Sequence, residues 1–370
     1  MGQNIITAED NYRSVDRWIL SHGLKKILLV SGNSIIRQKI NTYFELLPER
    51  LGISVIRFTD FTPNPLYESV VEGVRVFHEE DCSGIIAVGG GSAMDVAKCI
   101  KLYSNMNQEA HFLQQEIVPN DIPFLAMPTT AGTGSEATRY AVIYYKGTKQ
   151  SVTDSSCIPG TVLLDSSALK TLDLYQKKST MMDALCHAIE SFWSVNSTEE
   201  SRIYSREAIL KIMEHKDGYL ANTDAGNAGM LLAANTAGKA INIAQTTAGH
   251  AMCYKITSLF GCAHGHAAAL CDRVLFPWMV QSSSRCVDPR GSEYLCRTMD
   301  EIGHALGCEN AEIGANRFCQ MFQELGLEIP EATEEQFAEL RTSVNPVRLK
   351  NHPVYLEEQT IDRLYHIILR

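Results

Sequence analysis

The sequence lacks the long apolar run that a membrane-spanning helix requires. No stretch of its 370 residues approaches about 18 uninterrupted apolar residues. The polar, acidic start has no basic segment followed by an apolar one, so neither a transmembrane helix nor a signal peptide is expected. The eleven cysteines include no Cys-x-x-Cys pair, which favours reduced thiols in the cytoplasm over a disulfide framework.

An excess of positive charge is also absent. The net charge of −10 argues against nucleic acid or a membrane surface as partner. It leaves a small anionic substrate open, because a few cationic side chains suffice for one. The 45% of apolar and 21% of charged residues are ordinary for a globular protein, and a chain of this length predicts two domains. Internal repeats and low-complexity tracts are absent as well.

The first half of the chain alternates strand and helix patterns. Apolar runs predict buried strands at residues 26–31, 53–58, 84–88 and 123–127, and helical spacing predicts a helix over residues 67–79. This alternation indicates a doubly wound, mainly parallel sheet. From residue 180 onward helical patterns predominate, and residues 229–252 are predicted as one helix buried on most sides. We expect an α/β domain over residues 1–175 and an all-α domain over residues 176–370.

Two polar loops follow neighbouring predicted strands. Gly89-Gly90-Gly91-Ser92 lies between a strand and a predicted helix, where glycines allow close approach to an anion and the helix start offers free N–H groups. The run is neither a GxGxxG fingerprint nor a P-loop, so an ordinary glycine-rich turn is the alternative. Residues 128–136 form the second loop, rich in Thr, Gly and Ser. Two such loops beyond successive strands suit a dinucleotide.

Several histidines and one aspartate have metal-ligand spacing. Asp183 and His187 are four residues apart in a helical stretch, which places them on one face. An ordinary Asp–His pair on a helix surface has the same spacing. His250, His264 and His266 fall in one apolar region, as core residues or as ligands. One carboxylate and three imidazoles would form a plausible shell for iron or zinc.

Four segments resemble the signature motifs of iron-containing alcohol dehydrogenases, in the family's order and spacing. They are GGGSAMDVAK (89–98), PTTAGTGSEAT (128–138), DALCHAIE (183–190) and HAMCYKITSLFGCAHGHAAAL (250–270). The resemblance implies a dehydroquinate synthase-like architecture, with the active site in the cleft between two domains. It implies a hydride transfer between NADH or NADPH and a small aldehyde or primary alcohol, assisted by Fe2+ or Zn2+.

The resemblance also implies a role for individual residues. The metal ligands would be Asp183, His187, His250 and His264. Residues implied at the cofactor are Gly32, Asn64, Gly89, Gly90, Gly91, Ser92, Asp95, Thr129, Thr130, Thr133 and Lys149. His266, two residues past the fourth ligand position, is not expected to bind the metal. The sequence leaves the oligomeric state open, with a homodimer as one option.

The chain departs from the family pattern at two positions. Tyr254 stands where the family usually has a histidine near the reacting carbon, so Tyr254 and its neighbour Lys255 are the candidate catalytic residues. No acid follows the strand at residues 26–31, where NAD-preferring members often carry Asp, and Gly32 stands there instead. We therefore expect that NADPH is accepted.

Other details resemble the phosphonoacetaldehyde reductase subgroup. They are Tyr254-Lys255, His264-Gly265-His266 and the segment NPVRLKN at residues 345–351. A phosphonate needs cationic donors. The candidates are Lys255, Arg139, Arg348 and Lys350, each of which could equally face solvent.

Three alternative functions stay open from the sequence. A sugar-phosphate cyclase-like lyase shares the architecture and uses bound NAD transiently, without net turnover of free cofactor. A metal-binding protein without catalysis is supported only by the Tyr254 substitution. A general short-chain alcohol dehydrogenase would lack the phosphonate preference.

Overall fold

The structure is a computed structural model that describes residues 2–8, 11–344 and 346–369, without the Arg348 side chain. Asn345, one residue of the NPVRLKN segment, therefore lies outside the described residues. The chain divides into two compact units. The first comprises residues 1–130 and 134–172, and the second comprises residues 131–133 and 173–370.

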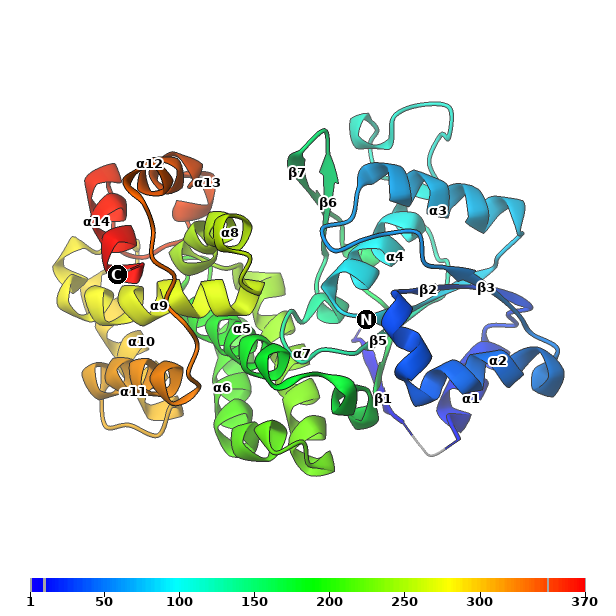
Figure 1. Cartoon of the computed structure of the whole chain (residues 1–370), viewed down its shortest axis with the longest axis horizontal. Coiled ribbons are helices and arrows are strands. Elements are labelled where there is room, and N and C mark those ends of the chain that lie inside the picture. Colours follow the sequence, from blue (N-terminus) through cyan, green and yellow to red (C-terminus); the bar gives the residue numbers. More distant parts are fainter. Residues whose placement is uncertain (1, 9–10, 345, 370) are drawn as a thin grey trace. The chain divides into compact units, whose positions relative to one another are not determined.

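A six-stranded sheet forms the centre of the first unit (Figure 1). Its order is β1-β8-β5-β4-β2-β3, and every neighbouring pair is parallel. The strands are β1 (Asn4–Thr7), β2 (Lys26–Ser31), β3 (Ser54–Phe58), β4 (Gly84–Gly89), β5 (Phe124–Pro128) and β8 (Thr161–Leu164). The chain passes from β2 to β3 on one side and then to β4 on the other. The winding direction therefore reverses between β2 and β4, and ligands bind beyond the carboxyl ends of strands at such a point.

Helices cover both faces of this sheet, as its nearly continuous apolar strands require. Alternate residues of β2, Leu28 and Val30, pack with α3 (Tyr67–Glu79) and α4 (Gly91–Tyr103). The intervening Ile27 and Leu29 pack with α1 (Arg13–Ser21) and α2 (Lys39–Leu51). The predicted doubly wound α/β sheet is thus confirmed.

An antiparallel hairpin of β6 (Tyr140–Tyr145) and β7 (Thr148–Thr153), which was not predicted from the sequence, follows β5 in the chain. Its turn is Lys146-Gly147, and both residues have positive φ, of 49° and 75°. Two consecutive positive φ angles are typical of the tight turn that matches strand twist. Gly147, a residue type that readily adopts positive φ, was the available sequence signal.

The second unit is helical, and no described residue after β8 belongs to a strand. Its helices are α5 (Leu174–Trp193), α6 (Glu199–Leu220), α7 (Asp224–Ala244), α8 (Ala248–Phe260), α9 (His264–Gln281), α10 (Ser292–Ala305), α11 (Ala311–Glu324), α12 (Glu334–Ser343), α13 (Pro346–Leu349) and α14 (Glu358–Ile368). Helix α5 packs against α6, α7 and α9. Among the described residues, no helix is both long and apolar enough to cross a membrane.

The prediction of one helix over residues 229–252 is wrong. Helix α7 ends at Ala244, and α8 begins at Ala248. Gln245 between them has a φ of 62°, a conformation that a helix does not contain. The polar run Gln245-Thr246-Thr247 is too short an interruption between two apolar segments to mark the break in the hydrophobic pattern. The break matters because it places His250 in the first turn of a new helix.

Candidate metal and cofactor sites

Helix α5 carries three buried polar side chains on one face. Asp183, His187 and Glu190 are spaced by four and three residues, which places them above one another along the helix. Their residues are 2%, 6% and 0% exposed. Buried ionisable groups require partners, and the partners come from α8 and from the loop after β5.

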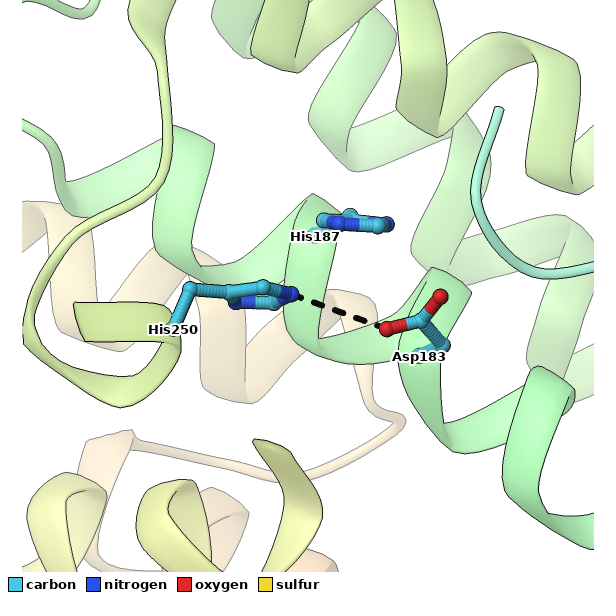
Figure 2. A group of neighbouring side chains, drawn as sticks. All are labelled: Asp183, His187 and His250. Atoms are coloured by element: carbon cyan, nitrogen blue, oxygen red, sulfur yellow. Dashed lines mark ion pairs between the residues drawn. The ribbon is translucent and has the colours of Figure 1, made fainter. Parts of the chain in front are cut away.

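Asp183 and His187 meet His250 of α8 (Figure 2). One candidate ligand atom from each residue lies within 4.8 Å of the other two. The two imidazole rings stack with centroids 4.4 Å apart and an interplanar angle of 19°. The structure therefore brings together three of the four residues that the sequence indicated as metal ligands.

Two atoms of this group are placed for a shared cation. Asp183 Oδ1 and His250 Nε2 are 3.6 Å apart, which is too far for a hydrogen bond. Neither atom has a hydrogen-bond partner among the described residues. Two ligands bound to one ion at about 2.0–2.2 Å in tetrahedral geometry lie roughly 3.3–3.6 Å apart. The donor set and its spacing therefore fit Fe2+ or Zn2+.

The His187 ring is oriented by a backbone carbonyl. Gly132 O lies 3.3 Å from His187 Nδ1, and a carbonyl can only accept, so Nδ1 carries the proton and Nε2 is left to bind a metal. Gly132 comes this close because it has no side chain. A Cβ there would lie 2.9 Å from the carbonyl oxygen of Thr180 on α5.

Glu190 holds the third member of the group. Its Oε1 accepts a short hydrogen bond from His250 Nδ1 and another from His250 N at 3.0 Å. Its Oε2 accepts from Thr247 N at 2.6 Å and from Thr247 Oγ1 at 2.7 Å. Glu190 was not among the residues predicted from the sequence. Its position one turn after His187 was the available signal.

The buried charges shift one another's pKa values. Burial raises the pKa of Glu190, but the His250 ring and the hydrogen bonds from Thr247 together outweigh that effect and lower it. Burial lowers the pKa of His250, while Glu190 and Asp183 raise it to about 10. Burial and the neighbouring Glu190 carboxylate raise the pKa of Asp272 well above its ordinary value. The raised pKa favours the uncharged form of Asp272, so the negative charge beside His250 comes from Glu190 and Asp183.

His264, the fourth expected ligand, lies beside the group. It is the first residue of α9, and its ring centroid is 5.3 Å from that of His250. Its Nδ1 is 3.7 Å from Cys253 Sγ. The cluster of ligand atoms found among the described residues does not include His264. Its assignment as a ligand stays a prediction.

Both ring nitrogens of His266 contact groups outside the candidate metal site. Its Nδ1 lies 3.1 Å from Tyr175 Oη, and its Nε2 lies 2.8 Å from the carbonyl oxygen of Glu328. Tyr175 Oη also accepts a hydrogen bond from Ala263 N, at the start of α9. His266 and Tyr175 therefore brace the helix that carries His264.

The candidate catalytic residues lie near this group but differ in environment. The Tyr254 ring, one turn after His250, stacks on His264 with centroids 5.3 Å apart. The Lys255 ammonium forms an ion pair with Glu339 of α12, and the two side chains are 30% and 50% exposed. An ion pair this exposed stabilises the fold little.

The two glycine-rich loops lie together at the carboxyl ends of β4 and β5. Gly89 pairs with Pro128 in the sheet, and Thr129 N donates to Gly89 O at 2.9 Å. A Cβ on Gly90 would lie 3.4 Å from the Thr130 side chain. Helix α4 begins at Gly91, so its first N–H groups have no acceptor within the helix. Gly32 follows β2, across the point where the winding reverses. This arrangement suits a phosphate-bearing cofactor.

A buried lysine that the sequence analysis did not identify supports these loops. Lys98 of α4 donates to Ser135 Oγ, Thr138 Oγ1 and the Tyr140 carbonyl. Ser135 Oγ in turn donates to Asp95 Oδ1 at 3.1 Å. Burial raises the pKa of Asp95 to about 6 despite the opposing charge of Lys98. Asp95 therefore links the second loop to α4.

The remaining cofactor candidates are more scattered. Asn64 is exposed, with a φ of 58°, in the loop before α3. Lys149 lies on β7, and its charge only partly opposes the rise that burial causes in the pKa of Asp95. Thr133 groups with the helical unit, next to Gly132. Their contacts to a cofactor stay predictions.

Comparison with known proteins relates this chain to curated enzymes. It is 30% identical over 296 residues to the phosphonoacetaldehyde reductase of Streptomyces viridochromogenes, covering 75% of this chain and 74% of the relative. It is 29% identical over 313 residues to alcohol dehydrogenase 4 of Schizosaccharomyces pombe, covering 82% and 71%. The NAD+ complex of sulfoacetaldehyde reductase from Bifidobacterium kashiwanohense has the same fold, with a TM-score of 0.87, 24% identity and coverage of 99% and 97%.

Family models match both parts of the chain. The model described as iron-containing alcohol dehydrogenase matches residues 2–166. The model for the C-terminal part of the Fe-containing alcohol dehydrogenase family matches residues 177–366. The resemblance seen in the sequence motifs is thus confirmed, and this chain belongs to the iron-containing alcohol dehydrogenase family of oxidoreductases.

Proposed function

We propose that Asp183, His187, His250 and His264 hold one Fe2+ or Zn2+ ion and that the protein reduces a small aldehyde with NADH or NADPH. The observation that carries the proposal is the buried pair of Asp183 Oδ1 and His250 Nε2, 3.6 Å apart and without hydrogen-bond partners among the described residues. When bound, the metal supplies a Lewis acid that polarises the aldehyde oxygen, and the nicotinamide supplies the hydride.

The chain's own residues would order and enclose this chemistry. Gly132 O fixes the His187 ring, and Glu190 fixes the His250 ring, so both imidazoles present Nε2. Met252 and Cys253 are fully buried, and Tyr254 covers His264, which keeps this part of α8 apolar. The Tyr254 phenol would donate a hydrogen bond where the family usually has a histidine. Family membership favours a dehydrogenase over a lyase, which would show no net change in nicotinamide absorbance.

Within this class we propose phosphonoacetaldehyde as substrate. The names of two related proteins support it, because phosphonoacetaldehyde and sulfoacetaldehyde both carry an anionic group on the carbon next to the aldehyde carbon. Lys255 is the cation that we propose for the phosphonate, since exchange of its exposed partner Glu339 for a substrate anion costs little. Asn351 hydrogen-bonds to Gln245 and Thr246, so the end of the NPVRLKN segment folds onto the loop before α8.

The substrate proposal predicts a selective defect in Lys255→Ala. Loss of a charged contact costs about 2–5 kcal/mol, so KM for phosphonoacetaldehyde should rise roughly 30-fold or more. Turnover of neutral propanal should barely change. Lys211→Ala is the matched control, because Lys211 forms a similarly exposed ion pair with Glu207 on α6. The measurement is a panel of aldehydes assayed with both cofactors on iron-loaded protein. Equal efficiency of the unmodified enzyme toward propanal and phosphonoacetaldehyde would contradict the substrate proposal.

The residue after β2 predicts the cofactor preference. Gly32 presents no carboxylate to repel a 2′-phosphate, and Arg37 and Lys39 follow as exposed cations. We expect NADPH to be a competent alternative to NADH. A preference for NADH above about 100-fold in kcat/KM, roughly 3 kcal/mol, would refute this expectation.

A single substitution makes the test of cofactor preference sharper. Gly32 has an extended backbone, and the nearest atom to an added Cβ is Ser34 Oγ at 3.9 Å. Gly32→Asp should therefore fold normally and shift the preference toward NADH by electrostatic repulsion. An unchanged NADPH/NADH ratio in this variant would show that the cofactor does not approach the end of β2.

A further inference from the structure

The break between α7 and α8 leaves the start of α8 without a capping side chain of its own. Thr247 occupies the N-cap position, but its side chain accepts no hydrogen bond from the helix. Glu190 of α5 takes this role by accepting the N–H groups of Thr247 and of His250, the third residue of α8. A carboxylate at a helix N-terminus is electrostatically favourable. Glu190 therefore determines where α8 begins relative to α5.

The same carboxylate also orients the His250 side chain. Its Oε1 accepts from His250 Nδ1, which leaves Nε2 directed toward Asp183 Oδ1. Thr247 Oγ1 donates to Oε2 and accepts from Trp193 Nε1 at 2.9 Å, so the hydroxyl that supports Glu190 is itself fixed. All of these side chains are fully buried or nearly so. The buried Glu190 carboxylate thus fixes both the start of α8 and the orientation of the His250 ring.

We propose that Glu190 is the positioning residue of the metal site: it fixes the start of α8 and the His250 ring so that Nε2 and Asp183 Oδ1 are held at metal-ligand spacing before an ion binds. This inference rests on the proposed metal site and deepens it. Helix α5 then supplies Asp183 and His187 as ligands and the carboxylate that sets the third. Carboxylate–histidine contacts of this kind fix ring orientation and strengthen metal binding.

Asp272 provides a matched control within the same buried cluster. It is fully buried on α9, and a Cβ added to Gly249 would lie 2.1 Å from Asp272 Oδ1 and 2.7 Å from Glu190 Oε1. The two carboxyl groups thus flank the same glycine. Within the described part of the chain, Asp272 makes no hydrogen bond to His250 that matches those of Glu190. If metal binding required only buried carboxyl groups near the site, replacing either residue would weaken it equally. If Glu190 positions His250, replacing Glu190 should weaken metal binding more than replacing Asp272.

The test compares Glu190→Gln with Asp272→Asn by cobalt binding to the metal-free full chain. Co2+ affinity is measured by competition with a chelator, and the visible absorption of bound Co2+ reports ligand geometry. Glu190→Gln should bind Co2+ about 10–100-fold more weakly with a changed spectrum. Asp272→Asn should stay within about threefold of the unmodified chain, because the amide has the shape of the carboxyl. Equal affinities and spectra in the two variants would overturn the proposal.

A milder variant covers the case in which Glu190→Gln does not fold. Thr247→Val removes the hydroxyl that donates to Oε2 and keeps the backbone N–H contact. It should weaken Co2+ binding roughly 3- to 10-fold, and unchanged affinity would count against the proposal. If the unmodified chain itself binds no Co2+, the proposed metal site fails. If it binds Co2+ while the variants match it, only the positioning role fails.

Discussion

His264→Ala is expected to lose its bound divalent metal, whereas His266→Ala is expected to keep it. His264 begins α9 with its ring 5.3 Å from that of His250, beside the three clustered ligands. Both nitrogens of His266 lie within hydrogen-bond distance of other groups, Tyr175 Oη and the Glu328 carbonyl. Substitutions outside the ligand shell already cost about 10–100-fold in affinity, so loss of a ligand should cost at least about 100-fold.

The two variants should also differ in stability. His266→Ala removes a buried side chain and leaves polar partners unpaired, which should lower the free energy of unfolding by about 1–3 kcal/mol. His264 is only partly buried, so its replacement should affect the metal-free fold less. The measurement is metal per chain after dialysis, together with aldehyde reduction and thermal unfolding of both variants. Full metal retention in His264→Ala would remove His264 from the ligand set.

Much of the α/β unit could be predicted because its signals are local. The strands at Lys26–Ser31 and Gly84–Gly89 are apolar runs that end at glycines, and α3 has the helical spacing of its valines. A strand of a parallel sheet is buried on both faces and is therefore apolar along its whole length, so a short apolar run of this kind indicates such a strand. The loop after β4 was placed correctly between strand and helix for the same reason.

The break before α8 could not be predicted from the pattern of apolar residues. Only the short polar run Gln245-Thr246-Thr247 separates two apolar segments, and glutamine is not a residue type that usually adopts positive φ. The turn is held by distant groups. Ser194 Oγ donates to the Ala244 carbonyl, and Asn351 donates to Gln245 and Thr246. Tertiary contacts between residues far apart in sequence thus decided this local structure.

Part of the candidate metal site could be predicted from the sequence because two of its residues lie close together on one helix. Asp183 and His187 share a helical face, so spacing alone indicated their proximity. His250 is held beside them by Glu190, 60 residues before it in the chain. No periodicity relates positions that far apart, and therefore the sequence indicated the ligands but not the group that positions one of them. The contacts of Lys98 with the second loop could not be predicted either, because they join residues that are far apart in the sequence.

The central claim is that one divalent ion at Asp183, His187, His250 and His264 is required for nicotinamide-dependent aldehyde reduction. Its most direct test is removal of metal from the unmodified protein with a chelator, followed by stepwise addition of Fe2+ without oxygen. Nicotinamide absorbance and bound metal are measured in the same samples. Activity should be absent without metal and should rise in proportion to bound ion up to one per chain, because the ion supplies several kcal/mol of transition-state stabilisation. Full reductase activity of the metal-free protein, or bound metal without net nicotinamide turnover on any aldehyde, would contradict the claim.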